Sequence, residues 1–75
     1  MADPVFRLDE NVAGSWYVDD TCIACDTCVG IAPRHFVLTP DDRHAYVWAQ
    51  PVSTTDVAQC QQAMGACPVG AIGHD

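Results

Sequence analysis

Short runs of apolar residues, separated by polar turns, predict small strands in the first two thirds of the chain. An aromatic and β-branched run at residues 15–18 is bounded by Gly14 and by two aspartates, as a short strand would be. Two more strand-like runs lie at residues 34–39 and 45–49. The Pro- and Asp-rich residues 40–44 between them have the length of a hairpin connection. We therefore expect one short strand followed by a small antiparallel hairpin.

A helical pattern follows in the last third of the chain. Ser53 and Asp56 form a Ser-x-x-Asp arrangement, which satisfies free backbone amides at the start of a helix. The pattern predicts a helix over residues 54–64, and Gly65 stands where a left-handed stop would fall. If the helical turn continues, one face carries Val57, Cys60, Met64 and Cys67. The chain then turns and ends in a short extended piece.

Residues 1–14 show no clear period and precede the first strand. We expect them to form an acidic N-terminal arm that packs on the body through Phe6, Leu8 and Val12. No low-complexity linker interrupts the chain. Residues 1–75 are therefore predicted to form a single domain of the α+β class, with short antiparallel strands and one main helix.

The chain is too short to rely on a hydrophobic core alone. At 75 residues, such a core rarely contributes more than about 3 to 5 kcal/mol. Five cysteines are present, an odd number, so disulfide pairing cannot use them all. The sequence shows neither a secretory signal pattern nor an apolar run long enough to cross a bilayer. We expect a cytoplasmic protein, in which clustered cysteines more often bind metal than form disulfides.

Acidic residues outnumber basic residues by ten to three, which gives a formal net charge of −7. Such a surface repels phosphate backbones and anionic lipids, so we expect neither nucleic-acid binding nor membrane binding. It favours a basic protein partner. We hypothesise that the docking side carries Asp19, Asp20 and Asp26, whose charges would raise the association rate more than the affinity.

The motif that carries chemistry is a Cys-x-x-Cys-x-x-Cys loop followed much later by a Cys-Pro pair. Its cysteines are Cys22, Cys25, Cys28 and Cys67, the last directly before Pro68. A cubane iron-sulfur cluster has four irons, each of which takes one thiolate. A compact loop can serve three irons while a remote segment serves the fourth. We therefore predict that these cysteines hold one 4Fe-4S cluster, which joins the two ends of the chain.

These motifs resemble those of bacterial-type ferredoxins with a single 4Fe-4S cluster. The resemblance rests on residues 20–28 and 67–72, on Ala32-Pro33 and on the lead-in at residues 11–20; it extends over roughly residues 11–73. It implies a ferredoxin-like fold in which N-terminal and C-terminal strands pair. It also implies a monomeric one-electron carrier, not an enzyme, that serves basic redox partners such as a ferredoxin reductase or an oxygenase. A 3Fe-4S form would be possible on iron loss.

The sequence departs from the two-cluster ferredoxin pattern at Ala32, where that pattern has a further cysteine. Some single-cluster relatives hold a disulfide between this position and a cysteine of the central helix. Cys60 has no such partner here. Two interpretations of Cys60 stay open: an inert buried thiol, or a spare ligand or redox-sensitive thiol beside the cluster.

Two other functions fit part of the pattern. A structural zinc site also takes four cysteines, but such sites usually pair two Cys-x-x-Cys knuckles. A cluster-based sensor of redox state or iron would use the same ligands to switch a contact. His35, His44 and His74 show no metal-binding spacing and are expected at the surface. Trp16 and Trp48 are expected to act as core or as cover for a thin domain.

Overall fold

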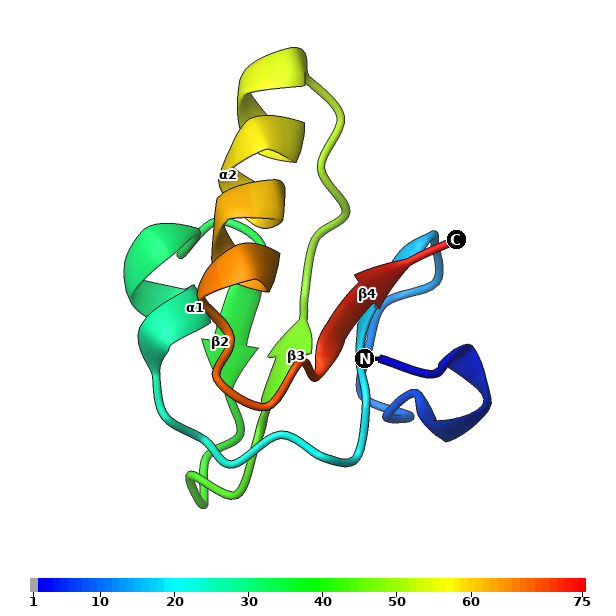
Figure 1. Cartoon of the computed structure of the whole chain (residues 1–75), viewed down its shortest axis with the longest axis vertical. Helices are drawn as coiled ribbons and strands as arrows, with labels where there is room; N and C mark the ends of the chain where they lie inside the picture. The colour runs from blue at the N-terminus through cyan, green and yellow to red at the C-terminus, as the bar shows by residue number, and fades with distance from the viewer. Residues whose placement is uncertain (1) are drawn as a thin grey trace.

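Two separate two-stranded sheets and one long helix dominate the computed structural model, which describes residues 2–75 (Figure 1). The elements in chain order are the 3-10 turn η1 (Pro4–Phe6), β1 (Trp16–Val18), α1 (Thr27–Ile31), β2 (Phe36–Leu38), β3 (Ala45–Val47), α2 (Thr54–Ala66) and β4 (Ile72–His74). β1 pairs antiparallel with β4, and β2 pairs antiparallel with β3. The first pairing ties the start of the chain to its end, and the second is a hairpin.

The hairpin and the pairing of the terminal strands are both confirmed. Val37 stands opposite Tyr46 in the hairpin, and Tyr17 stands opposite Gly73 in the other sheet. The strands are shorter than the apolar runs that predicted them, at three residues each. Helix α1 was not predicted, because its five residues span little more than one turn and show no apolar period.

Helix α2 begins where the sequence predicts but ends later. The Asp56 N–H donates to Ser53 Oγ over 3.1 Å, as the capping arrangement requires. The predicted stop at Gly65 is wrong, because the helix continues to Ala66 and Cys67 then turns to extended backbone. Pro68 follows Cys67, and the residue before a proline is driven out of the helical region by steric contact. The proline therefore sets the end of the helix.

The hydrophobic core lies between the two sheets and the helices. Its fully buried members include Val18, Phe36, Val47 and Cys60. Trp16 is buried with them, as expected of a core aromatic. Trp48 instead covers the edge of the molecule: half of it is exposed, and its indole N–H donates to the Pro33 carbonyl. Within residues 2–75, no helix is long and apolar enough to span a membrane.

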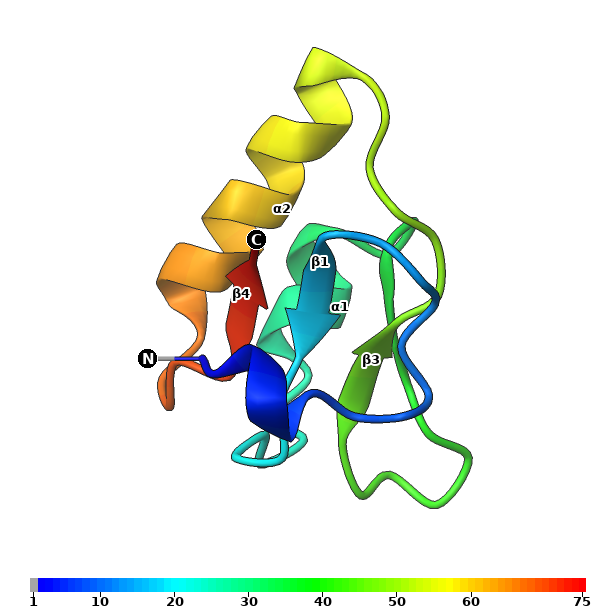
Figure 2. The same ribbon diagram turned by 90° about the vertical axis from the view of Figure 1, so that its right-hand side faces the viewer.

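The N-terminal arm is held by backbone hydrogen bonds more than by packing. Only Leu8 packs against the core, because Phe6 is 54% exposed and Val12 is 41% exposed. The expectation that all three pack was therefore wrong. The Leu8 N–H donates to the Val18 carbonyl over 3.0 Å, and the Val12 N–H donates to the Val47 carbonyl over 2.8 Å. Figure 2 shows the arm crossing from the β1 side to the β3 side before it returns into β1.

The side chain of Asn11 connects the two sheets. Its Oδ1 accepts hydrogen bonds from the backbone N–H groups of Val18 and Val47, over 3.2 Å and 2.9 Å. Its Nδ2 donates to the carbonyls of Leu8 and Val18, over 2.8 Å each. Val18 lies in β1 and Val47 in β3, so one amide supplies the polar partners that a continuous sheet would otherwise provide.

A second amide fixes the entry into β1. Gln50 accepts from the Trp16 N–H over 3.0 Å and donates to the Trp16 carbonyl over 2.9 Å. Gly14 passes close beneath it with a φ of +147°, and a Cβ added there would stand 2.4 Å from the Gln50 side chain. Only glycine fits this position, since both the space and the backbone angle exclude a side chain.

We predict that Asn11→Ala destabilises the protein by about 2 to 3 kcal/mol, because it removes four hydrogen bonds and leaves two strand amides without partners. Thermal unfolding followed by circular dichroism should show a midpoint lower by about 10 °C or more. The matched control is Gln61→Ala on the exposed face of α2, which should change stability by less than about 0.5 kcal/mol. Equal shifts for the two variants would contradict the role given to Asn11.

Candidate metal centre

The four cysteines of the motif line one hollow. Cys22 and Cys25 reach it from the loop between β1 and α1, Cys28 reaches it from the first turn of α1, and Cys67 reaches it from the end of α2. The rest of its wall is mostly apolar and includes Val18, Ala45 and Ile72. The fold thus brings a remote cysteine beside a local group of three. Cys60 is not among the residues that line this hollow.

The crowding of these thiols has an electrostatic cost. Burial raises the pKa of Cys28 to about 12, and repulsion from Cys22, Cys25 and Cys67 contributes in the same direction. The thiolate form of Cys28 is therefore strongly disfavoured when no positive charge is present. A metal centre would remove the thiol protons and compensate the negative charges of the sulfurs. Cys28 would therefore ionise only when it binds a cation.

The backbone of the cysteine loop is wound tightly. Ala24 and Asp26 both adopt left-handed conformations, with φ of +57° and +68°. Left-handed backbone costs a residue other than glycine roughly 1 kcal/mol or more. These two residues alternate with the cysteines, so the loop reverses direction between successive thiols. The Ala24 N–H lies 3.5 Å from the Cys22 sulfur as a result. Loops with alternating conformations of this kind form concave anion sites.

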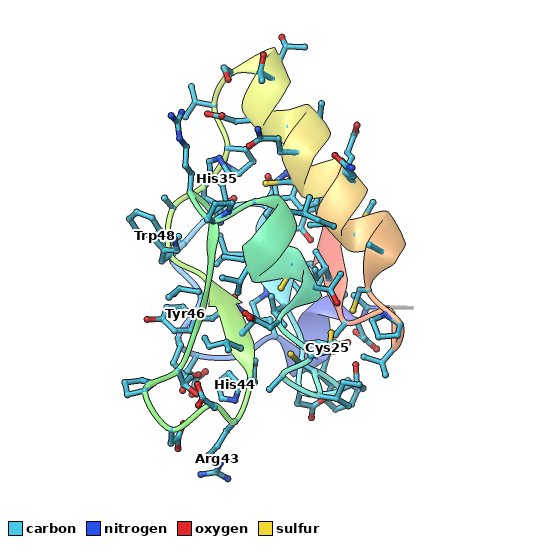
Figure 3. All side chains as sticks on the ribbon, turned by 90° about the vertical axis from the view of Figure 1, so that its left-hand side faces the viewer. Cys25, His35, Arg43, His44, Tyr46 and Trp48 are labelled. Carbon is cyan, nitrogen blue, oxygen red and sulfur yellow. The ribbon has the colours of Figure 1, made fainter. Side chains whose placement is uncertain are left out.

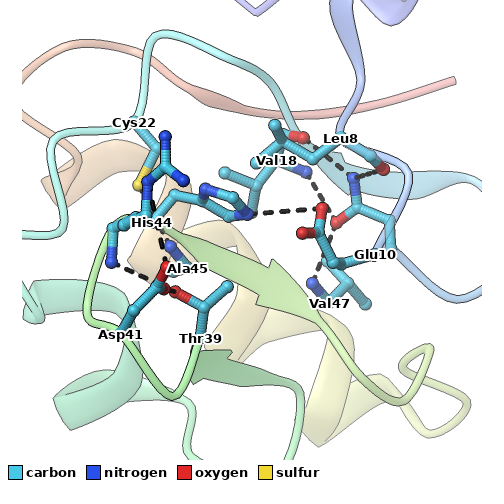
Figure 4. Close-up of polar contacts among 11 residues, drawn as sticks. Leu8, Glu10, Val18, Cys22, Thr39, Asp41, His44, Ala45 and Val47 are labelled. Carbon is cyan, nitrogen blue, oxygen red and sulfur yellow. Dashed lines mark hydrogen bonds and ion pairs between the residues drawn. The ribbon is translucent and has the colours of Figure 1, made fainter.

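Backbone amides from outside the loop also point at the sulfurs. The Ala45 N–H, at the start of β3, donates to Cys22 Sγ over 3.3 Å (Figure 4). The Ala71 N–H donates to Cys67 Sγ over 3.3 Å. These donors stabilise negative charge on sulfur. Sequence reasoning missed them, because a backbone N–H leaves no mark in the residue pattern.

The four thiols differ in their access to solvent. Cys28 is buried, Cys22 and Cys67 are half-buried, and Cys25 is exposed. Figure 3 shows Cys25 below the middle of the view, well away from the start of α2 at the top. The Thr27 hydroxyl lies 3.3 Å from the Cys25 sulfur, and this hydrogen bond lowers the pKa of the thiol. Cys25 is thus the outward-facing member of the group.

The donor set suits either an iron-sulfur cluster or zinc, since both take four thiolates. Zinc sites usually pair two Cys-x-x-Cys knuckles, whereas here three cysteines stand close together and the fourth stands alone before Pro68. This spacing favours the cluster.

One of the acidic residues assigned to the docking side is not at the surface. Asp19 is only 2% exposed, and its carboxylate accepts hydrogen bonds from the backbone N–H groups of Asp3 and Thr21, over 3.2 Å and 3.0 Å. It ties the arm to the start of the cysteine loop, so the hypothesis was wrong for this residue. Asp20 and Asp26 are exposed and keep the proposed position beside the loop.

The expectation of surface histidines was wrong for His35. It is 4% exposed, and its Nδ1 donates to the Ala49 carbonyl over 2.8 Å. Its Nε2 lies 3.7 Å from the Asp56 carboxylate, so the ring bridges the hairpin and the start of α2. His44 is half-buried, and its Nε2 lies 3.3 Å from the Glu10 carboxylate, whereas His74 is exposed. Figure 4 draws the His44–Glu10 pair with a dashed line. None of the three lines the hollow.

The environment of Cys60 favours the inert-thiol interpretation. Its side chain is 0% exposed and belongs to the core cluster together with Ala32 and Ala63. Burial raises the pKa of Cys60 to about 11, so almost all of this thiol stays protonated at neutral pH. A redox-reactive cysteine needs thiolate character and access, and Cys60 has neither. Cys60 also does not line the hollow that the four motif cysteines share, so its position does not suit a spare ligand.

Similar proteins are found by sequence and by structure. Residues 18–74 match the family model described as the 4Fe-4S single cluster domain of Ferredoxin I. Ferredoxin-1 of Desulfocurvibacter africanus is 42% identical over 62 residues, which cover 81% of this chain and 92% of that protein. A ferredoxin of Thermococcus kodakarensis is 43% identical over 54 residues, which cover 71% of this chain and 78% of that protein. The crystal structure of ferredoxin I from Desulfovibrio africanus matches with a TM-score of 0.69 and 42% identity, over 84% of this chain and 97% of that one.

Proposed function

This chain belongs to the family of single-cluster 4Fe-4S ferredoxins, and on that premise we propose that it is a one-electron carrier and not an enzyme. It would pass electrons from a reductase to an acceptor enzyme. The observation that carries the proposal is the hollow lined by four thiols. Besides the thiols, its wall is mostly apolar, with Asp26 and Thr27 among its polar members.

The proposed ligands are Cys22, Cys25, Cys28 and Cys67, and the cofactor is one 4Fe-4S cluster. Four thiols match one ligand for each iron. When bound, the cluster stores or releases one electron. The amides of Ala45 and Ala71 would offset part of the added negative charge, because each already donates to a ligand sulfur.

The protein controls the access of water to the site. Val18, Ala45 and Ile72 are almost fully buried and close its inner side. Cys25 opens it to solvent on the outer side. Solvent exposure and hydrogen bonds to sulfur are among the factors that set the reduction potential. We also propose that iron loss can yield a 3Fe-4S form, since an exposed ligand gives oxidants a route to the site.

Metal analysis tests the function directly. Protein purified without oxygen should contain about four iron and four sulfide per chain, as one cubane requires. Reduction with dithionite should produce the EPR signal of a reduced cubane, and reoxidation should remove it without unfolding the chain. A brief exposure to air should yield the signal of a 3Fe form. A colourless protein with one zinc per chain, or a cluster that releases a partner on oxidation, would contradict the carrier proposal.

Paired serine variants test the ligand assignment. Cys67→Ser should remove one thiolate from the hollow and cut the iron retained after purification by half or more. Cys60→Ser should keep the full iron content, because Cys60 lies in the core and not on the hollow. Cys60→Ala is the second control, since a buried hydroxyl could itself destabilise the core. Equal iron loss for the variants at positions 60 and 67 would overturn the assignment.

The proposed partners are basic redox proteins in the cytoplasm. The net charge of −7 and the exposed carboxylates of Asp20 and Asp26 support electrostatic attraction of such a partner to the cysteine loop.

Ionic strength tests the charge of the partner. The second-order rate of electron transfer to a basic c-type cytochrome should fall steeply from low to high salt, as surface charges become screened. Asp20→Asn and Asp26→Asn should each slow the reaction by roughly two- to fivefold at low salt and by little at high salt. Asp9→Asn in the arm makes the same charge change outside the loop and should have a smaller effect. A rate that does not change with salt would contradict the proposal.

A further inference from the structure

Two exposed aliphatic side chains border the candidate metal centre. Ile23 is 59% exposed and belongs to the cysteine loop, and Val69 is 37% exposed and follows Cys67. Both line the same hollow as the four thiols. They come from opposite ends of the chain, so only the fold places them on one site. Other exposed aliphatic residues, such as Val52 and Val5, do not line it.

Cys25 is the outward-facing thiol of the hollow that Ile23 and Val69 also line. Cys25 is exposed, whereas the other three motif cysteines are half-buried or buried. The rate of electron transfer falls steeply as the distance between donor and acceptor grows. A partner must therefore approach the Cys25 side of the hollow, and Ile23 and Val69 line the hollow that it would meet there.

We propose that Ile23 and Val69 form an apolar contact patch beside Cys25, onto which an electron-transfer partner docks with an apolar centre and a basic rim. The charge of the rim follows from Asp26, which lines the same hollow and is exposed, and from the net charge of −7. This inference rests on the proposed function, since it assigns the surface through which the carrier works.

The composition of this surface matches that of protein interfaces in general. Their centres are apolar and exclude water, and their rims are polar and charged. Two aliphatic side chains make a small centre, which suits the weak and short-lived encounters of electron-transfer proteins. The acidic residues would accelerate the encounter, while the apolar pair would hold the partner in the orientation that brings its redox group to Cys25.

The test compares Ile23→Ser and Val69→Ser with the control Val52→Ser, which changes a 91% exposed valine outside the hollow. The acceptors are a basic c-type cytochrome and, separately, ferricyanide, which needs no protein interface. Each patch variant should slow electron transfer to the cytochrome by roughly three- to tenfold. The loss should persist at high salt, where the effect of Asp26→Asn disappears. Val52→Ser should match the wild type, and no variant should react more slowly with ferricyanide.

The outcomes separate this inference from the function on which it rests. Wild-type protein without a redox-active cluster would refute the proposed function itself. Wild-type protein that transfers electrons normally, with patch variants equally fast, would overturn the contact patch alone. Equal slowing toward both acceptors would also overturn it, because the substitutions would then act on the cluster and not on docking. Iron content and reduction potential are measured for each variant, and Ile23→Leu should restore the rate lost in Ile23→Ser.

Discussion

Four thiols crowded at one hollow are the constraint around which this small protein is organised. They repel one another as anions, so the pKa of the buried Cys28 is raised to about 12 by its burial and by the other three. A positive centre bound by the proposed ligands would convert this repulsion into attraction and would link the cysteine loop to the end of α2. A chain of 75 residues would gain from this link the stability that its thin core cannot supply. All four thiols lie within residues 18–74, the part of the chain that matches the model of the single-cluster ferredoxin family.

The scaffold around the hollow depends on connections between distant segments. The β1–β4 pairing places the last strand beside the first, and Asn11 joins β1 to β3 through four hydrogen bonds. Each of these two connections holds a strand next to a backbone N–H group that donates to a cysteine sulfur. Ala45 opens β3 and donates to Cys22, and Ala71 precedes β4 and donates to Cys67. The strands are therefore short, but their positions allow backbone N–H groups to donate hydrogen bonds to the cysteine sulfurs.

The sequence predicts the parts of this structure that arise from local pattern. The hairpin, the start of α2 at Ser53 and the ferredoxin-like α+β fold are confirmed, the last by the match to a solved ferredoxin structure. The errors arise where contacts between residues distant in the sequence determine whether a side chain is buried. Asp19 resembles its exposed neighbour Asp20 in sequence, yet the amides of Asp3 and Thr21 bind its carboxylate in the interior. His35 is buried, where its ring donates to the Ala49 carbonyl. The backbone N–H groups that donate to the sulfurs cannot be recognised from any side chain in the sequence.

A carrier of this kind has to satisfy two opposed requirements at one site. Burial protects a cluster from water and holds its ligands, but an electron can leave only where the distance from the cluster to the protein surface is short. The fold meets both by grading the exposure of its thiols, from the buried Cys28 to the exposed Cys25. The exposed side then needs cover that a partner can replace. In the proposed contact patch, aliphatic side chains would provide it, because they shed water readily and make no specific bond that would slow the partner's departure. The acidic residues act at longer range. In this proposal, acidic residues attract the partner and aliphatic residues make the direct contact.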